Sequence, residues 1–241
     1  MENIEKNPEL DNMDEATLCQ IMRTILEKGI EITQDVLEHE TLQDITQIGE
    51  DIADAVDTIR RIRKIASIPT KLFMNKFVRY CQGMTDIPLE QRQRFLTELG
   101  KDKFNQEGAF TLNVIQKIEE KEKIPLLLKL LGARVYNQID DIEYRRLMIL
   151  TDRTLYNDLL YLKENITADP VSLKTEADYG LAASGLLVTA GNGFIRGMQG
   201  DSNSSILFNY TISAKKLSHI FFGTECSDLP TNIGIIGMAT V

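Results

Sequence analysis

The sequence predicts a mainly α-helical protein, in which a helical bundle is followed by a small α+β C-terminal domain. Two observations predict this fold class. Apolar residues recur every three or four positions through most of residues 14–162, which is the spacing of amphipathic helices. Nine of the 15 glycines then lie between Gly180 and Gly237, where short apolar runs bounded by Gly, Asn and Ser indicate loops and brief strands.

The N-terminal part begins with polar residues 1–13, which we expect to be flexible. Asp14 can cap a first helix, which Gly29 ends, and a second helix begins near Thr33. A heptad seam follows, with apolar residues at alternating steps of three and four. Its members are Ile45, Ile48, Ile52, Ala55, Ile59, Ile62 and Ala66. The seam indicates either an intermolecular coiled coil or the core stripe of a bundle, and the pattern fits both.

The bundle is predicted to continue to residue 140. Ser67-Ile68-Pro69 breaks the seam, and a basic amphipathic helix follows until Gly83. Further helices are predicted over residues 88–100, 109–118 and 125–139. The last of these is apolar on so many sides that it must be buried.

Residues 141–241 are predicted to form the second domain. Two helices come first, up to Leu162, then a short helix around 177–187, a Gly/Ser-rich loop over 191–205, a strand over 206–212 and a helix over 213–222. This order predicts a winged-helix-like domain. Residues 229–241 carry no charge, so we expect an apolar C-terminal arm that packs on its own domain or on a neighbouring molecule.

Two stretches carry a resemblance to known proteins. IPTKLFMNKFVRYCQG (residues 68–83) and ILFNYTISAKKLSHIFF (residues 206–222) resemble uncharacterised helical proteins of bacterial prophages and defence islands that end in a winged-helix-like segment. The resemblance implies a place in a bacterial phage-related or defence system. It carries over no catalytic residue.

Charge is sorted along the chain. Residues 1–57 have a net charge of −13 and residues 60–104 a net charge of +7, within a total of −9. Opposite charges attract over about 8–10 Å at physiological salt, which predicts pairing of the two blocks within one molecule or head to tail between copies. The candidate interaction residues are the basic Arg60, Arg61, Arg63, Lys64, Lys71, Lys76 and Arg79 and the seam residues Ile45, Ile48, Ile52, Ile59 and Ile62.

Nucleic acid is the alternative partner. The acidic balance, with a pI near 4.9, opposes binding to it. The candidate recognition segment, residues 175–189, contains Glu176 and Asp178 but no Lys or Arg, the residues that neutralise phosphates. The basic residues at 60–79 can contact phosphates or form a solvated face balanced by the acidic N-terminal helices. We expect a protein partner or a homo-oligomer before nucleic acid.

Patterns of catalysis and metal binding are incomplete. The histidines are His39 and His219, so acid–base catalysis would fall to carboxylates, Lys or Tyr. The zinc pattern H-E-x-x-H that starts at His39 has Gln43 in its last position, and His219 with Cys226 supplies too few ligands.

Three further patterns have simpler explanations. Gly191-Asn192-Gly193 is followed by Gly197, one residue too late for a dinucleotide-binding loop. Ser213 and Lys216 have the S-x-x-K spacing, but helix capping by Ser213 explains the serine. The acids Asp51, Asp54 and Asp57 drift around a helix and indicate a solvated surface. We predict no cofactor and no metal.

Composition also predicts the compartment. Cys19, Cys81 and Cys226 lie far apart and are expected to be reduced. The N-terminus does not have the pattern of a secretory signal, and no apolar run reaches the ~18–20 residues of a membrane-spanning helix. We therefore interpret the chain as a cytoplasmic protein-interaction or self-assembly module. A nucleic-acid-binding winged-helix regulator is the alternative, and an enzyme that uses carboxylates is the third hypothesis.

Overall fold

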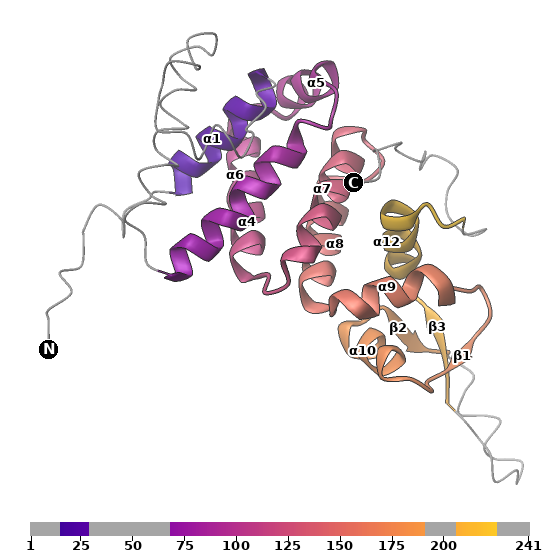
Figure 1. The fold of residues 1–241 in the computed structure, drawn as a ribbon. Coiled ribbons are helices and arrows are strands. Elements are labelled where there is room, and N and C mark those ends of the chain that lie inside the picture. Colours follow the sequence, from indigo (N-terminus) through magenta and orange to yellow (C-terminus); the bar gives the residue numbers. More distant parts are fainter. Residues whose placement is uncertain (1–14, 29–67, 191–205, 226–241) are drawn as a thin grey trace, which may run out of the picture. The chain divides into compact units, whose positions relative to one another are not determined.

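The computed structural model describes residues 15–28, 68–190 and 206–225. These residues are mainly helical and include a small three-stranded antiparallel sheet (Figure 1). The chain divides into two compact units, Met1–Lys117 and Ile118–Val241. The sequence-based division into residues 1–13, 14–140 and 141–241 is a different one, drawn from composition rather than from packing.

Unit 1 is helical throughout its described residues. Its helices are α1 (Glu15–Lys28), α4 (Ile68–Met84), α5 (Leu89–Leu99) and α6 (Lys101–Lys117). Helix α1 packs on the other three. Its apolar residues recur at steps of three and one, which places them on one face, and this face is buried. The buried residues of α1 are Leu18, Cys19, Ile21, Met22, Thr24, Ile25 and Leu26.

Unit 2 combines helices with the sheet. Its elements are the 3-10 helix η2 (Lys121–Lys123), α7 (Ile124–Val135), α8 (Asp141–Arg153), α9 (Tyr156–Asn165), β1 (Val171–Ser172), α10 (Glu176–Ser184), β2 (Leu187–Thr189), β3 (Leu207–Tyr210) and α12 (Ile212–Phe222). Helix α7 contacts α8 and α12, and α12 also contacts α9. The predicted burial of α7 is confirmed, since nine of its residues are buried.

The sheet has the strand order β1-β3-β2, with both pairs antiparallel. Leu187 of β2 lies opposite Tyr210 of β3, and both side chains are buried. Helix α10 contacts β2 and α9. The side of the sheet that carries these two residues therefore belongs to the core of unit 2.

Several element boundaries differ from the sequence prediction. Helix α6 begins at Lys101 rather than near residue 109. Gly100, which has a positive φ of 74°, separates it from α5, which ends at Leu99. Gly83 does not end α4, which continues to Met84. The short helix predicted around 177–187 is α10 and ends at Ser184, where Gly185 adopts a left-handed conformation with φ 83°. Strand β1 was not predicted.

Candidate protein-interaction surface

The structure describes three of the sequence-predicted interaction residues, Lys71, Lys76 and Arg79, all on α4. Lys71 and Arg79 are exposed, whereas Lys76 is half-buried and donates from Nζ to the backbone oxygen of Gln116 at 3.0 Å. The other candidates lie outside the described residues. They are Arg60, Arg61, Arg63, Lys64, Ile45, Ile48, Ile52, Ile59 and Ile62.

Lys76 is one of four cations that each donate to a backbone carbonyl in the last turn of another helix. The last four carbonyls of a helix have no partner within it and form the negative end of the helix dipole, so a cation satisfies both the hydrogen bond and the charge. The pairs are Lys76 with Gln116 of α6 at 3.0 Å, Arg92 with Ile25 of α1 at 3.1 Å, Lys123 with Asp152 of α8 at 3.0 Å, and Lys129 with Phe221 of α12.

These contacts account for part of the basic character seen in the sequence. Burial lowers the pKa of Arg92, and burial together with the nearby Lys163 lowers the pKa of Lys129. Both side chains donate hydrogen bonds within their own unit, Arg92 to α1 and Lys129 to α12. Positive charge in the stretch 60–104 is thus partly structural, and Lys76 and Arg92 are engaged within unit 1.

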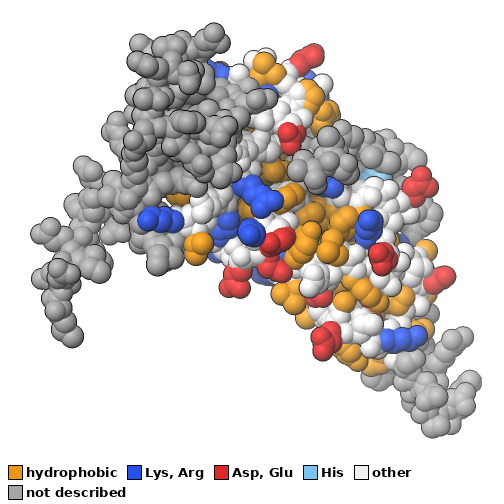
Figure 2. Space-filling model, in the orientation of Figure 1, with side chains coloured by type: hydrophobic (Ala, Val, Ile, Leu, Met, Phe, Trp, Pro, Cys, Tyr) orange, Lys and Arg blue, Asp and Glu red, His pale blue; other side chains and the backbone are white. Residues whose placement is uncertain are grey.

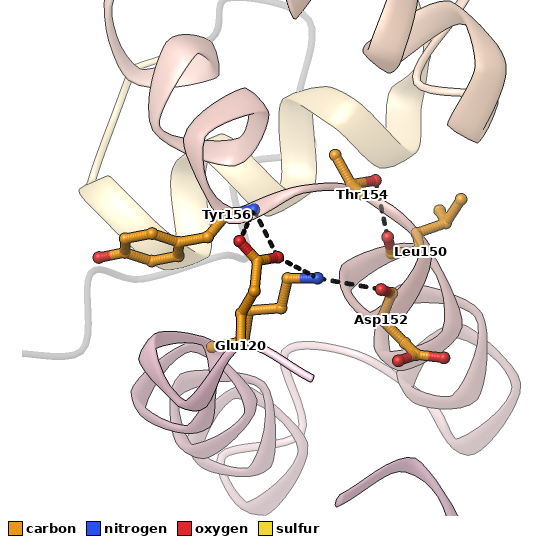
Figure 3. Close-up of polar contacts among 6 residues, drawn as sticks. Glu120, Leu150, Asp152, Thr154 and Tyr156 are labelled. Atoms are coloured by element: carbon orange, nitrogen blue, oxygen red, sulfur yellow. Dashed lines mark hydrogen bonds and ion pairs between the residues drawn. The ribbon is translucent and has the colours of Figure 1, made fainter. Parts of the chain in front are cut away.

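Residues 120–123 pin the junction between α8 and α9 (Figure 3). The Glu120 carboxylate accepts hydrogen bonds from the backbone N–H of Tyr156, the first residue of α9, at 3.0 and 3.2 Å. The same carboxylate pairs with Nζ of Lys123 at 2.9 Å. An acid therefore binds the positive end of α9 while a cation binds the negative end of α8 at Asp152. We name these contacts of residues 120–123 the pin.

Helix α8 carries apolar residues on two opposite faces. One face is buried and consists of Tyr144, Leu147, Met148 and Thr151. At 3.6 residues per turn, the opposite side carries Ile142, Arg146, Ile149 and Arg153, which follow one another at steps of four, three and four. We name these four residues the outer α8 face. Ile142 is 65% exposed and Ile149 is 36% exposed, although the side of a helix that faces away from a core is normally polar.

The outer α8 face is also positively charged. Within the described ranges, neither Arg146 nor Arg153 forms an ion pair or a hydrogen bond. Glu143, an acid on the same helix, is paired with Lys216 of α12. Two isoleucines with two unpaired arginines form a surface that can bury apolar area and neutralise carboxylates at the same time.

Other exposed apolar side chains in unit 2 are scattered over several elements. Figure 2 shows that hydrophobic side chains reach the surface in several places among charged ones. They include Leu155, Leu160, Tyr179, Val188, Ile206 and Ile212. Single exposed apolar residues are normal on protein surfaces, so the regular spacing on α8 is the more informative feature.

Two carboxylates of unit 2 have pKa values shifted in opposite directions. Burial, with the nearby charges of Glu120 and Glu176, raises the pKa of Asp158 on α9. Burial would also raise the pKa of Asp178, but hydrogen bonds from Lys174, Thr175 and Tyr161 outweigh it and lower that pKa.

The two carboxylates have different structural surroundings. Asp178 and Thr175 form a capping box at the start of α10, which accounts for the burial of Asp178. Unequal carboxylates are a pattern of acid–base sites. Among the described residues, however, no group of three or more potential ligands is placed to hold a metal ion.

Two residues of the incomplete catalytic patterns, His219 and Lys216, have identified partners, and Lys216 pairs with Glu143. Nδ1 of His219 lies 2.9 Å from the backbone oxygen of Thr224. The prediction that Ser213 caps the last helix is wrong, because Thr211 is the cap and its Oγ1 accepts from the backbone N–H of Ala214 at 3.2 Å. Residues outside the described ranges are His39, Gln43, Asp51, Asp54, Asp57, Gly191, Asn192, Gly193, Gly197 and Cys226.

The sequence interpretation missed the outer α8 face, although a signal for it was present. Ile142 and Ile149 are seven residues apart, and an arginine follows each of them after four residues. The inward-facing Leu147 and Met148 lie between them, and the sequence analysis predicted a helix here without assigning a second apolar face to it. Helix periodicity places the two sets on opposite sides, but only the packing shows that Leu147 and Met148 are buried and that Ile142 and Ile149 are exposed.

No helix in the described ranges is both long enough and apolar enough to cross a membrane. Comparisons with protein-family models, curated proteins and solved structures find no match to this chain.

Proposed function

We propose that this chain is a protein-interaction module that binds a helical partner through the outer α8 face. The observation that carries the proposal is the exposure of Ile142 and Ile149 on the side of α8 opposite its buried face. Fully burying such a side chain contributes about 1.5–3 kcal/mol, and Arg146 and Arg153 add charge selectivity. A partner with apolar residues flanked by carboxylates fits this surface.

The proposal includes the finer fold assignment, a helical bundle over residues 14–140 and a winged-helix-like domain over residues 141–241. The antiparallel pair of β2 and β3, which follows α10 along the chain, supports the second part. Helix α10 offers no Lys or Arg, and its acids include Asp178 in the capping box. A winged helix of this composition would dock on protein rather than read a DNA groove.

The cellular setting is part of the same proposal. The resemblance of residues 68–83 and 206–222 supports a role in a bacterial phage-related or defence system. Cys19 and Cys81 are buried and form no disulfide within the described residues, and burial raises the pKa of the Cys81 thiol, which favours an inert reduced thiol. We place the protein in the cytoplasm on this basis.

A photo-cross-linking residue tests the proposed function. We would introduce it at position 149 of the 241-residue chain in the native host and identify the adducts by mass spectrometry. The matched control is position 169, which is exposed in the loop after α9. We expect one polypeptide to cross-link at position 149, to do so again at position 142, and to be lost when Arg146→Glu and Arg153→Glu are combined. Equal adducts at 149 and 169, or none at 149, would refute the proposal.

A further inference from the structure

We propose that the partner of the outer α8 face is an acidic segment of a second copy of this chain, residues 44–57. This inference rests on the proposed function and names its partner. The segment reads DITQIGEDIADAVD and contains five acids with no Lys or Arg. It includes Ile45, Ile48 and Ile52, the first part of the heptad seam.

The spacing of the two surfaces matches. In the acidic segment, Asp44 and Asp51 are seven residues apart, and so are Ile45 and Ile52. On α8, Ile142 and Ile149 are seven apart, and so are Arg146 and Arg153. The heptad pattern predicts a helix for the segment, and seven residues of helix span about 10.5 Å. If two such helices run antiparallel, Ile142 can lie opposite Ile52 and Ile149 opposite Ile45. Asp51 and Asp44 then lie three residues, or about 4.5 Å along the axis, from Arg146 and Arg153, which is within reach of an arginine side chain.

The charges favour the same occupant. Within the described ranges Arg146 and Arg153 have no carboxylate partner, and the N-terminal 57 residues hold a net charge of −13. Opposite charges on two surfaces speed their association, and like charges disfavour the binding of other partners.

The length of the seam favours assembly between copies. From Ile45 to Ala66 the seam covers 22 residues, or about 33 Å as a helix, whereas the 13 residues of α8 span about 20 Å. Because the seam is longer than α8, some of its apolar residues would extend past α8 and could contact a further helix. The contact joins two different surfaces, so each copy keeps one free segment and one free face, and the copies must form a ring or an open chain.

A charge swap in the purified 241-residue chain tests this inference, with the mass in solution measured by analytical ultracentrifugation. We expect assemblies larger than a monomer at low salt and a shift toward monomer near 1 M salt, where exposed charges are screened. Arg146→Glu with Arg153→Glu should weaken assembly about tenfold or more, as should Asp44→Arg with Asp51→Arg. All four substitutions together should restore it.

The matched control is Lys71→Glu with Arg79→Glu, which changes the net charge equally at exposed sites on α4. It should leave the mass unchanged, and thermal melting should show that every variant is folded. A monomeric wild-type chain, dissociation by the α4 pair instead of the α8 pair, or failure of the four-fold variant to reassemble would each overturn the inference. If cross-links at position 149 still identify another protein, the proposed function stands and only this partner assignment fails.

Discussion

At the scale of single residues, Gly180 leaves room for the Asp158 carboxylate, which occupies the space where a side chain at position 180 would lie. A Cβ added at Gly180 would lie 2.0 Å from Oδ2 of Asp158, which α9 places against α10. We expect Gly180→Ala to destabilise the protein by about 1–3 kcal/mol, the usual cost of overpacking. Thermal melting followed by circular dichroism would show it.

The double variant provides the control for this contact. In an Asp158→Ala background the clash is absent, and Gly180→Ala should then be neutral or stabilising by up to about 1 kcal/mol, because alanine is the better helix former. The two substitutions should therefore be strongly non-additive. An equal loss of stability in both backgrounds would show that Asp158 is not the cause.

Asp158 also makes the stability depend on pH. Burial and the charges of Glu120 and Glu176 raise its pKa in the folded protein above the unfolded value. Between the two pKa values the folded state binds more protons, so this group stabilises the fold less as pH rises. We expect Asp158→Asn to raise the free energy of unfolding most at neutral pH and progressively less as the pH falls to about 4, near the unfolded pKa. Denaturant titrations at several pH values would check this, and a difference that grows toward low pH would contradict it.

At the scale of elements, the helices of each unit are joined through their ends as well as through their apolar faces. Lys123, which is 4% exposed, binds the end of α8 and the carboxylate that caps α9. We expect Lys123→Met to cost about 1–3 kcal/mol, because it leaves partly buried acceptors without their donor. Lys121→Met is the matched control, since Lys121 is exposed on the same turn. Equal melting temperatures for the two variants would show that the pin contributes no stability.

At the scale of the whole molecule, the charge distribution predicts weak attraction to nucleic acid. The net charge is −9, Lys76 and Arg92 are engaged at helix ends, and α10 lacks cations. We expect no micromolar binding when the protein is titrated with single- and double-stranded DNA and RNA at low salt. Binding that Arg60→Glu with Arg63→Glu abolishes without unfolding would favour the nucleic-acid-binding regulator, and its affinity would fall steeply with salt.

The sequence by itself determined the helical character and most helix positions. Helix α1 has its apolar residues at steps of three and one between Asp14 and Gly29, α5 lies between Pro88 and Gly100, and the burial of α7 follows from its composition. These features depend on neighbours within about four residues, which is why a linear pattern contains them.

Only the tertiary structure decided what the cations and the outer residues of α8 do. Lys76 and Arg92 look like members of a basic surface in the sequence, but each donates to a helix end 40 or 67 residues away. The helical period separates Ile142 and Ile149 from Leu147 and Met148, but only the packing decides that the second pair is buried and the first is exposed. Both outcomes depend on which elements contact each other in the folded protein. A pattern that covers only a few neighbouring residues does not contain that information. The physical reason is that burial and charge pairing are properties of the packed chain, whereas helix periodicity is a property of the local one.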